Sequence, residues 1–146
     1  MGATGTTVSD VQIEALGIRC PIGDCKVILG RPMLGSALVA GNIAELSNLL
    51  VIALESAALA ATALVPCAYE VPKLQIGPTY QVKPSAGETW VVGNRLGFNQ
   101  LSDLIQLGAG AGFSKIGYAL EAKAANASEC LIHFKGNTEA ALLTST

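Results

Sequence analysis

The chain has 146 residues, of which 51% are hydrophobic and 14% are charged. This length allows one domain with a buried core, and a mean hydropathy of +0.48 excludes an intrinsically disordered protein. Nine basic and eleven acidic residues give a net charge of −2. That charge provides no positive field for binding phosphates, so we expect no direct contact with nucleic acid. The low charged fraction indicates a surface that is buried against other subunits.

The N-terminal residues 1–10 are small and polar, and they have neither the basic nor the apolar region of a secretory signal. We therefore expect a flexible arm over 1–10, a single β-rich domain over 11–146, and a protein that stays in the cytosol. The longest apolar stretch, Leu49 to Val65, is interrupted by Glu55. A membrane-spanning helix needs about 20 apolar residues, so we expect no membrane contact.

Short β-branched runs followed by turn residues predict two strands, at Lys26–Leu29 and at Trp90–Val92. Between them, prolines recur at every sixth position from Pro66 to Pro84. This spacing excludes a long helix and favours edge strands and turns. Apolar residues over 43–50 follow helical spacing, so the sequence is also compatible with one short helix there.

Residues 51–65 and 117–131 form a weak internal repeat, in which Ala-Leu-Glu precedes a tract of small residues and then an apolar run. In each copy the small residues predict a turn, which lies at Ala57–Ala61 in the first copy. Glu55 and Glu121 occupy matching places in the two copies. We expect both carboxylates to accept hydrogen bonds from backbone N–H groups in their turns.

The second copy of the repeat has the clearer pattern, because apolar residues alternate with more polar ones along Ser128–Lys135. Alternation predicts a half-buried strand, and we expect Ile116–Leu120 to pair with it. By analogy, Val51–Leu54 should pair with Thr62–Val71. The alternative is that both copies are alanine-rich helices, because alanine is the best helix former.

The sequence contains no arrangement that predicts catalysis, a cofactor or a metal site. The only histidine, His133, lies in an alternating strand and is expected at a surface or an interface. Glycines between Gly108 and Gly112 precede a predicted strand, which excludes a dinucleotide-binding loop. The four cysteines are Cys20, Cys25, Cys67 and Cys130. We expect them to stay reduced in the cell, and Cys20 and Cys25 lack the second pair of ligands that a zinc site requires.

Two aromatic residues, Tyr80 and Trp90, are candidates for a subunit interface, because such rings bury a large area at a low entropic cost. A core position for either ring is an equally good interpretation.

Three blocks of the sequence carry a resemblance to a known family. They are YEVPK at 69–73, YQV at 80–82 after a glycine-proline turn, and KIGYALEAKAANASECLIHFKG at 115–136. Together these blocks resemble the small head decoration, or capsid cement, proteins of tailed bacteriophages, and the last block is similar to that of lambda-type trimeric decoration proteins. The resemblance covers residues 51–136. It implies a compact, mostly β, barrel-like or tulip-like domain with a flexible N-terminal arm and no catalytic residues.

The resemblance also implies a function in the virion. The expected protein binds the outer surface of the capsid after assembly in the host cytoplasm and stabilises the lattice of the major capsid protein. We expect a homotrimer rather than a dimer, with Val8, Val11 and Ile13 as candidate capsid contacts.

Two alternatives remain open. One is another phage structural module, such as a head fibre base or a tail component. The other is a small enzyme or ligand-binding β-barrel that uses His133, Cys130 and Glu121.

Overall fold

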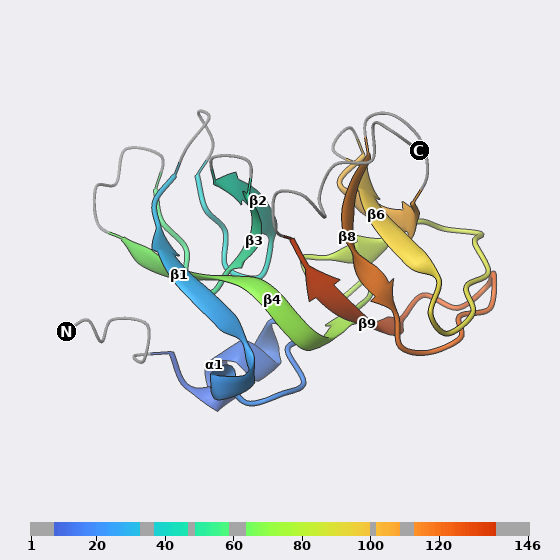
Figure 1. Cartoon of the computed structure of the whole chain (residues 1–146), viewed down its shortest axis with the longest axis horizontal. Helices are drawn as coiled ribbons and strands as arrows, with labels where there is room; N and C mark the ends of the chain where they lie inside the picture. The colour runs from blue at the N-terminus through green and yellow to red at the C-terminus, as the bar shows by residue number, and fades with distance from the viewer. Residues whose placement is uncertain are drawn as a thin grey trace.

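The structure is a computed structural model that describes residues 8–32, 37–46, 49–58, 64–99, 102–108 and 113–136. Within these residues the chain is mostly β, with one sheet curled into a half-barrel and one short α-helix (Figure 1). The fold class predicted from the sequence is therefore confirmed.

The elements follow one another in a simple order. Helix α1 (Asp10–Ala15) and the 3₁₀ turn η2 (Ile22–Asp24) precede the first strand. The strands are β1 (Lys26–Gly30), β2 (Ile43–Leu46), β3 (Leu49–Ala53), β4 (Val65–Ile76), β5 (Lys83–Pro84), β6 (Arg95–Asn99), β7 (Leu104–Leu107), β8 (Phe113–Ala119) and β9 (Cys130–Lys135). Their order in the sheet is β2-β3-β4-β9-β8-β6-β7-β5, and β1 pairs with β4 outside this path.

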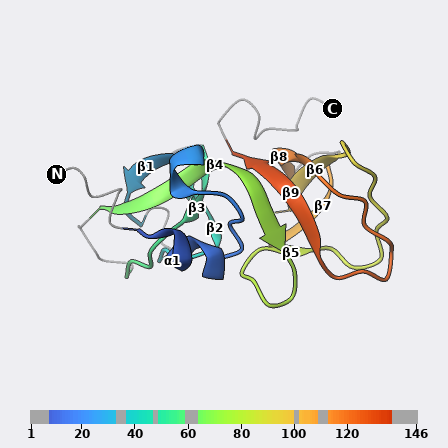
Figure 2. The same cartoon turned by 90° about the horizontal axis from the view of Figure 1, so that it is seen from below.

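Strand β4 connects the two halves of the sheet (Figure 2). Its first half pairs with β1 on one edge and with β3 on the other, where Ile52 faces Ala68. Its second half pairs with β9, where Leu74 faces Ile132. The predicted pairings of the two repeat copies are therefore confirmed, as β3 with β4 and as β8 with β9.

Two prolines lie inside β4, although proline spacing favoured turns and edge strands. Pro66 is the second residue of the strand, where a missing N–H disturbs few ladder bonds. Pro72 lies where the register between β4 and β9 shifts, between Val71 and Leu74. A bulge leaves a residue out of the ladder, so the absent N–H of Pro72 costs no hydrogen bond there.

The helix considered for residues 43–50 is wrong, because this segment contributes to the two antiparallel strands β2 and β3. Successive residues of β3 are buried on opposite faces of the sheet: Leu50 and Ile52 in one apolar cluster, Val51 in another. A helix with one apolar stripe cannot bury both sets of side chains. The turn predicted at Ala57–Ala61 lies largely outside the described residues.

The strand predicted at Trp90–Val92 is also wrong. Trp90 forms an isolated bridge with Lys123, and Val91 and Val92 are exposed at a turn. The strand starts later, at Arg95. The β-branched side chains of Val91 and Val92 are therefore not part of a strand.

Helix α1 begins inside the segment predicted to be an arm. The Ser9 hydroxyl accepts a hydrogen bond from the Gln12 N–H at 3.2 Å, and the Gln12 side chain accepts one from the Ser9 N–H at 2.8 Å. This capping box starts the helix. Val8 is only 2% exposed and packs in the core. The arm boundary at residue 10 is therefore wrong for residues 8–10, and residues 1–7 lie outside the described residues.

The sheet has a different apolar cluster on each face. The inner face holds the large core, which includes Cys130, Ile132 and Phe134 of β9, as the alternation predicted. The opposite face, here called the outer face, holds a smaller cluster of Leu38, Leu46, Val51, Ala53, Val65 and Cys67. Partly buried residues pack against this second cluster and form what we call the outer apolar patch: Ile28, Ala44, Leu49, Ala57 and Tyr69.

Gly117 allows β8 and β9 to approach closely, and replacing it tests the sheet. Its φ is +134°, and an added Cβ would overlap the carbonyl oxygen of His133. We expect Gly117→Ala to lower the free energy of unfolding by about 3 kcal/mol or more, measured by urea denaturation. Gly23→Ala is the control, because nothing lies within 4 Å of its added Cβ. Equal effects of the two substitutions would contradict this approach of the strands.

Candidate functional site

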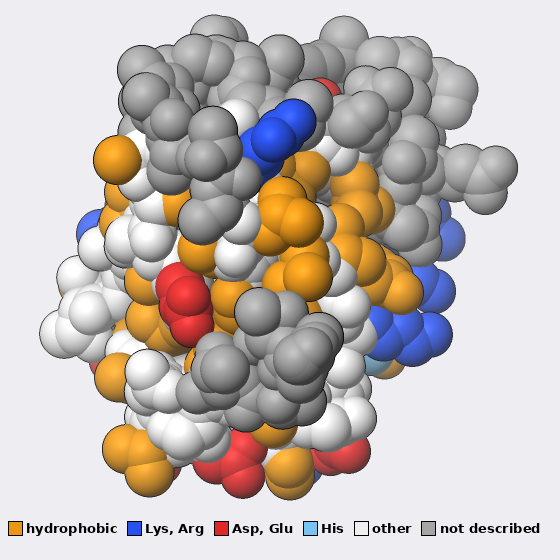
Figure 3. All heavy atoms as spheres, turned by 90° about the vertical axis from the view of Figure 1, so that its left-hand side faces the viewer, with side chains coloured by type: hydrophobic (Ala, Val, Ile, Leu, Met, Phe, Trp, Pro, Cys, Tyr) orange, Lys and Arg blue, Asp and Glu red, His pale blue; other side chains and the backbone are white. Residues whose placement is uncertain are grey.

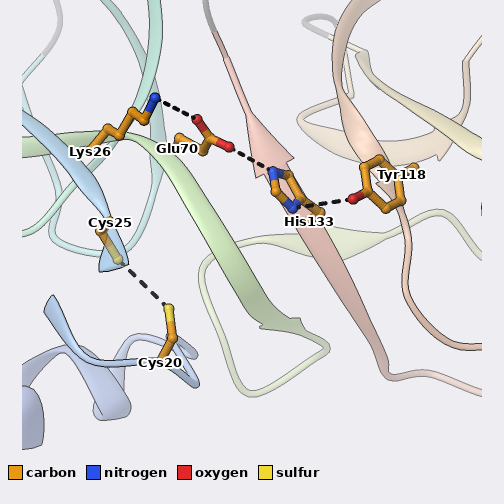
Figure 4. A network of polar contacts seen from close by, with 6 residues as sticks. All are labelled: Cys20, Cys25, Lys26, Glu70, Tyr118 and His133. Carbon is orange, nitrogen blue, oxygen red and sulfur yellow. Dashed lines mark hydrogen bonds and ion pairs between the residues drawn. The ribbon is translucent and has the colours of Figure 1, made fainter. Parts of the chain in front are cut away.

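A row of polar side chains crosses the outer face in the middle of the sheet (Figure 4). The His133 Nε2 atom lies 2.9 Å from Oε2 of Glu70, and the Lys26 Nζ atom lies 3.7 Å from the other oxygen, Oε1. On the opposite side, the Tyr118 ring stacks on the His133 ring, with 5.0 Å between centroids and 12° between planes. The Tyr118 hydroxyl lies 3.5 Å from His133 Nδ1.

Strand pairing explains this row. His133 lies between the buried residues Ile132 and Phe134, so its side chain points to the outer face. Glu70 on β4 and Tyr118 on β8 belong to the two strands that flank β9. Both ring nitrogens of His133 thus have a polar partner, and the imidazole links three neighbouring strands. This arrangement joins β4, β9 and β8 through side chains on the outer face.

Of the three residues considered for a ligand site, Cys130 and Glu121 are in contact, whereas His133 lies apart from them. Cys130 is buried on the inner face, whereas His133 lies on the outer face of the same strand. Burial raises the pKa of the Cys130 thiol, and its Sγ lies 3.5 Å from the backbone oxygen of Glu121. The Glu121 carboxylate accepts a hydrogen bond from the Leu131 N–H at 3.0 Å, so it binds a backbone donor as expected, but this donor lies in β9 and not in the turn.

The two aromatic residues considered for an interface have partners within the chain. Trp90 is 0% exposed and belongs to the large core, so the core interpretation holds for this residue. Tyr80 is partly buried, and the guanidinium of Arg19 lies 5.4 Å from the centre of its ring. Arg19 also donates a hydrogen bond to the Tyr80 hydroxyl.

Trp90 is part of a buried polar cluster that sequence reasoning missed. Lys123 is 2% exposed, and its ammonium lies 5.2 Å from the centre of the Trp90 ring and donates to the backbone oxygen of Glu88 at 2.8 Å. The Glu88 carboxylate accepts hydrogen bonds from Trp90 Nε1 at 3.0 Å and from the Leu107 N–H at 2.9 Å. A lysine among alanines gives no sequence signal of burial. The cluster fastens the 120–128 loop to the segment before β6.

The structure separates the three candidate capsid contacts. Val8 and Ile13 are buried in the large core, so they are not available to a partner, contrary to the expectation from the sequence. The physical reason is α1, which turns Ile13 towards the sheet. Val11 lies on the opposite side of the helix and is 76% exposed.

Apolar side chains reach the surface on the side of the molecule that carries β1 to β3 (Figure 3). The outer apolar patch lies there, and Ile28 and Tyr69 are its members on the paired strands β1 and β4.

The described residues contain no group of three or more His, Cys, Asp or Glu side chains that could hold a metal ion. Within the same residues, the helices are too short and too polar to cross a membrane. Comparisons of the chain with family models, with curated proteins and with solved structures found no match.

The buried cluster at Lys123 predicts a cost for removing its charge. We expect Lys123→Met, which keeps the apolar stem, to lower the free energy of unfolding by about 1–3 kcal/mol, because the Glu88 carbonyl loses its donor and the Trp90 ring loses its cation. Lys135→Met is the matched control at an exposed position and should change stability by less than about 0.5 kcal/mol. Urea denaturation measures both. Similar losses for the two variants would contradict the role of the cluster.

Cys67 predicts how stability falls at alkaline pH. Burial raises the pKa of this thiol from 9.0 to about 11. Between these values the unfolded chain loses the proton and the folded chain keeps it, so the free energy of unfolding falls as pH rises. We expect Cys67→Ala to reduce the slope by up to about 1.4 kcal/mol per pH unit, measured by urea denaturation with a reductant present. An unchanged slope would contradict this linkage.

Proposed function

We propose that this protein is a structural virion protein that binds the outer surface of a tailed-phage capsid and stabilises the lattice of its major capsid protein. The observation that carries this proposal is the outer apolar patch, a partly buried apolar surface on paired strands. Such a patch can bury side chains against a capsid protein, because desolvated apolar residues at the centre of an interface provide most of the binding energy.

The placement of the family-like blocks supports the proposal. The block at 69–73 lies in β4, and the block at 115–136 contains most of β8 and the whole of β9. These strands are direct neighbours, in the order β4-β9-β8. The block at 80–82 follows β4, and its Val82 packs in the large core. The blocks at 69–73 and 115–136, which are distant in sequence, thus form one continuous part of the sheet.

The proposed mechanism is differential binding. A protein that binds the assembled shell and not its alternatives stabilises that shell by mass action, and the effect is repeated at every symmetry-related site. A net charge of −2 gives little long-range attraction, so the interaction should depend weakly on salt. A homotrimer at positions of local threefold symmetry would add avidity, because three patches would bind together.

A different location on the particle is the main competing proposal. A head fibre base or a tail component would use the same kind of apolar patch. Binding to isolated heads and to isolated tails distinguishes the two, since a capsid cement saturates heads in a fixed ratio to the shell protein.

The test is co-sedimentation of the purified protein with decoration-free expanded heads of its parent phage. We expect saturable binding and heads that resist heat better, and light scattering after size exclusion should show a trimer. Binding only to tails, or no binding by a well-folded protein, would overturn the proposal.

Variants locate the binding surface. We expect Ile28→Thr, which keeps a β-branched side chain but removes apolar contact, to weaken head binding by about tenfold or more. Val92→Ser is the control, because it removes an exposed aliphatic side chain, 66% exposed, from a turn outside the patch. Val11→Gln tests whether α1 also contacts the shell. Circular dichroism of each variant verifies folding, and equal affinities for Ile28→Thr and the native chain would exclude the outer apolar patch.

A further inference from the structure

We propose that Cys20 and Cys25 are a redox pair that forms an intramolecular disulfide when the protein meets a small-molecule disulfide such as oxidised glutathione. Their sulfur atoms are 3.8 Å apart, and both thiols are free (Figure 4). The sequence predicts that the thiols stay reduced in the cell. In the structure Cys20 and Cys25 are close enough to form a disulfide when the protein meets an oxidant outside the cell. The proposal concerns the chain alone and is independent of capsid binding.

The backbone on both sides holds the two sulfurs close. Just before Cys20, the Arg19 N–H donates to the Lys73 carbonyl of β4 at 2.9 Å. Cys25 directly precedes β1, and its N–H donates to the Ile22 carbonyl at 3.0 Å, closing η2. The Ile22 N–H is in turn held by the Asp10 carboxylate of α1 at 2.9 Å. A disulfide has an S–S distance of about 2.0 Å, so the two sulfurs must come about 1.8 Å closer to form the bond.

Both cysteines of the pair are partly exposed, and Cys20 lies beside a surface cavity. It lines a surface cavity of about 330 Å³, together with Asp10, Glu14 and Arg19. An oxidant bound in this cavity would lie beside Cys20. The other two cysteines, Cys67 and Cys130, are fully buried and should not react in the folded protein.

The reaction proceeds by two exchanges. The Cys20 thiolate attacks one sulfur of oxidised glutathione, which forms a mixed disulfide and releases one glutathione as its thiolate. The Cys25 thiolate then attacks the Cys20 sulfur, forms the protein disulfide and releases the second glutathione. The two protein thiols give up two electrons and two protons, and the oxidant is reduced to two glutathione thiols.

The electrostatics of Cys25 set this order. Burial, the neighbouring Cys20 and the carboxylates of Asp24 and Asp10 raise the pKa of the Cys25 thiol to about 12. Cys25 is therefore a poor first nucleophile. In the mixed disulfide the Cys20 sulfur carries no charge and no longer forms a thiol hydrogen bond with Cys25. Two of the causes that raise the pKa of Cys25 are then removed. The first exchange thus prepares the second.

The expected product is a closed loop of six residues that ties the end of η2 to the segment after α1. The same cross-link lowers the conformational entropy of the unfolded chain, so the melting temperature should rise by roughly 5 °C. Reduction by dithiothreitol should reverse the shift.

The experiment incubates the full chain with oxidised glutathione and then alkylates the remaining thiols under denaturing conditions. We expect intact mass to show two alkylated cysteines instead of four, and peptide mapping to link Cys20 to Cys25. Four alkylated cysteines, a linkage between two chains, or a glutathione that stays on Cys20 would overturn the proposal.

Matched variants separate the two steps. Cys25→Ser should stop at the mixed disulfide and retain one glutathione on Cys20. Cys20→Ser should react at least about tenfold more slowly, because only Cys25 remains of the pair. Cys67→Ala is the control and should form the disulfide at the native rate. A Cys20→Ser variant that takes up glutathione as fast as Cys25→Ser would contradict the assigned order.

Discussion

The hydrogen-bonded ladders along β4 are the constraint on which the molecule depends. This strand of twelve residues is paired on both edges over its first half and with β9 over its second half, so it belongs to both halves of the sheet. Its alternation sends Ala68 into the large core and Cys67 into the smaller outer cluster. Side chains of β4 pack on both faces of the sheet. Those on the outer face contribute to the outer apolar patch and to the polar row at His133.

Local patterns in the sequence were sufficient for much of this sheet. Alternation along β9 and the matching repeat predicted two strand pairs, because each pattern reports burial on one face. The short helix predicted for residues 43–50 was wrong, since a strand with both faces buried and a short helix have similar apolar content. Helix α1 could have been found from Ser9 and Gln12, whose types and three-residue spacing are those of a capping box.

The candidate sites were harder to predict, because their residues meet through tertiary contacts. Glu121 binds a backbone N–H as predicted, although its partner lies in the following strand rather than in the turn. Lys123 and Trp90 are separated by more than thirty residues, and their types give no hint of contact. The spacing of Cys20 and Cys25 is visible in the sequence, but their closeness depends on η2 and on the anchor at Lys73.

Pro72 helps to set the register of β4 against β9 during folding. Sliding β4 by one residue along β9 would turn every inner side chain outward and would place the proline ring where the ladder needs a donor. A slipped pairing thus loses both its hydrophobic contacts and a hydrogen bond, whereas the native register loses neither at the bulge. The bulge therefore selects one alignment of the central strands and disfavours misaligned, aggregation-prone forms during folding.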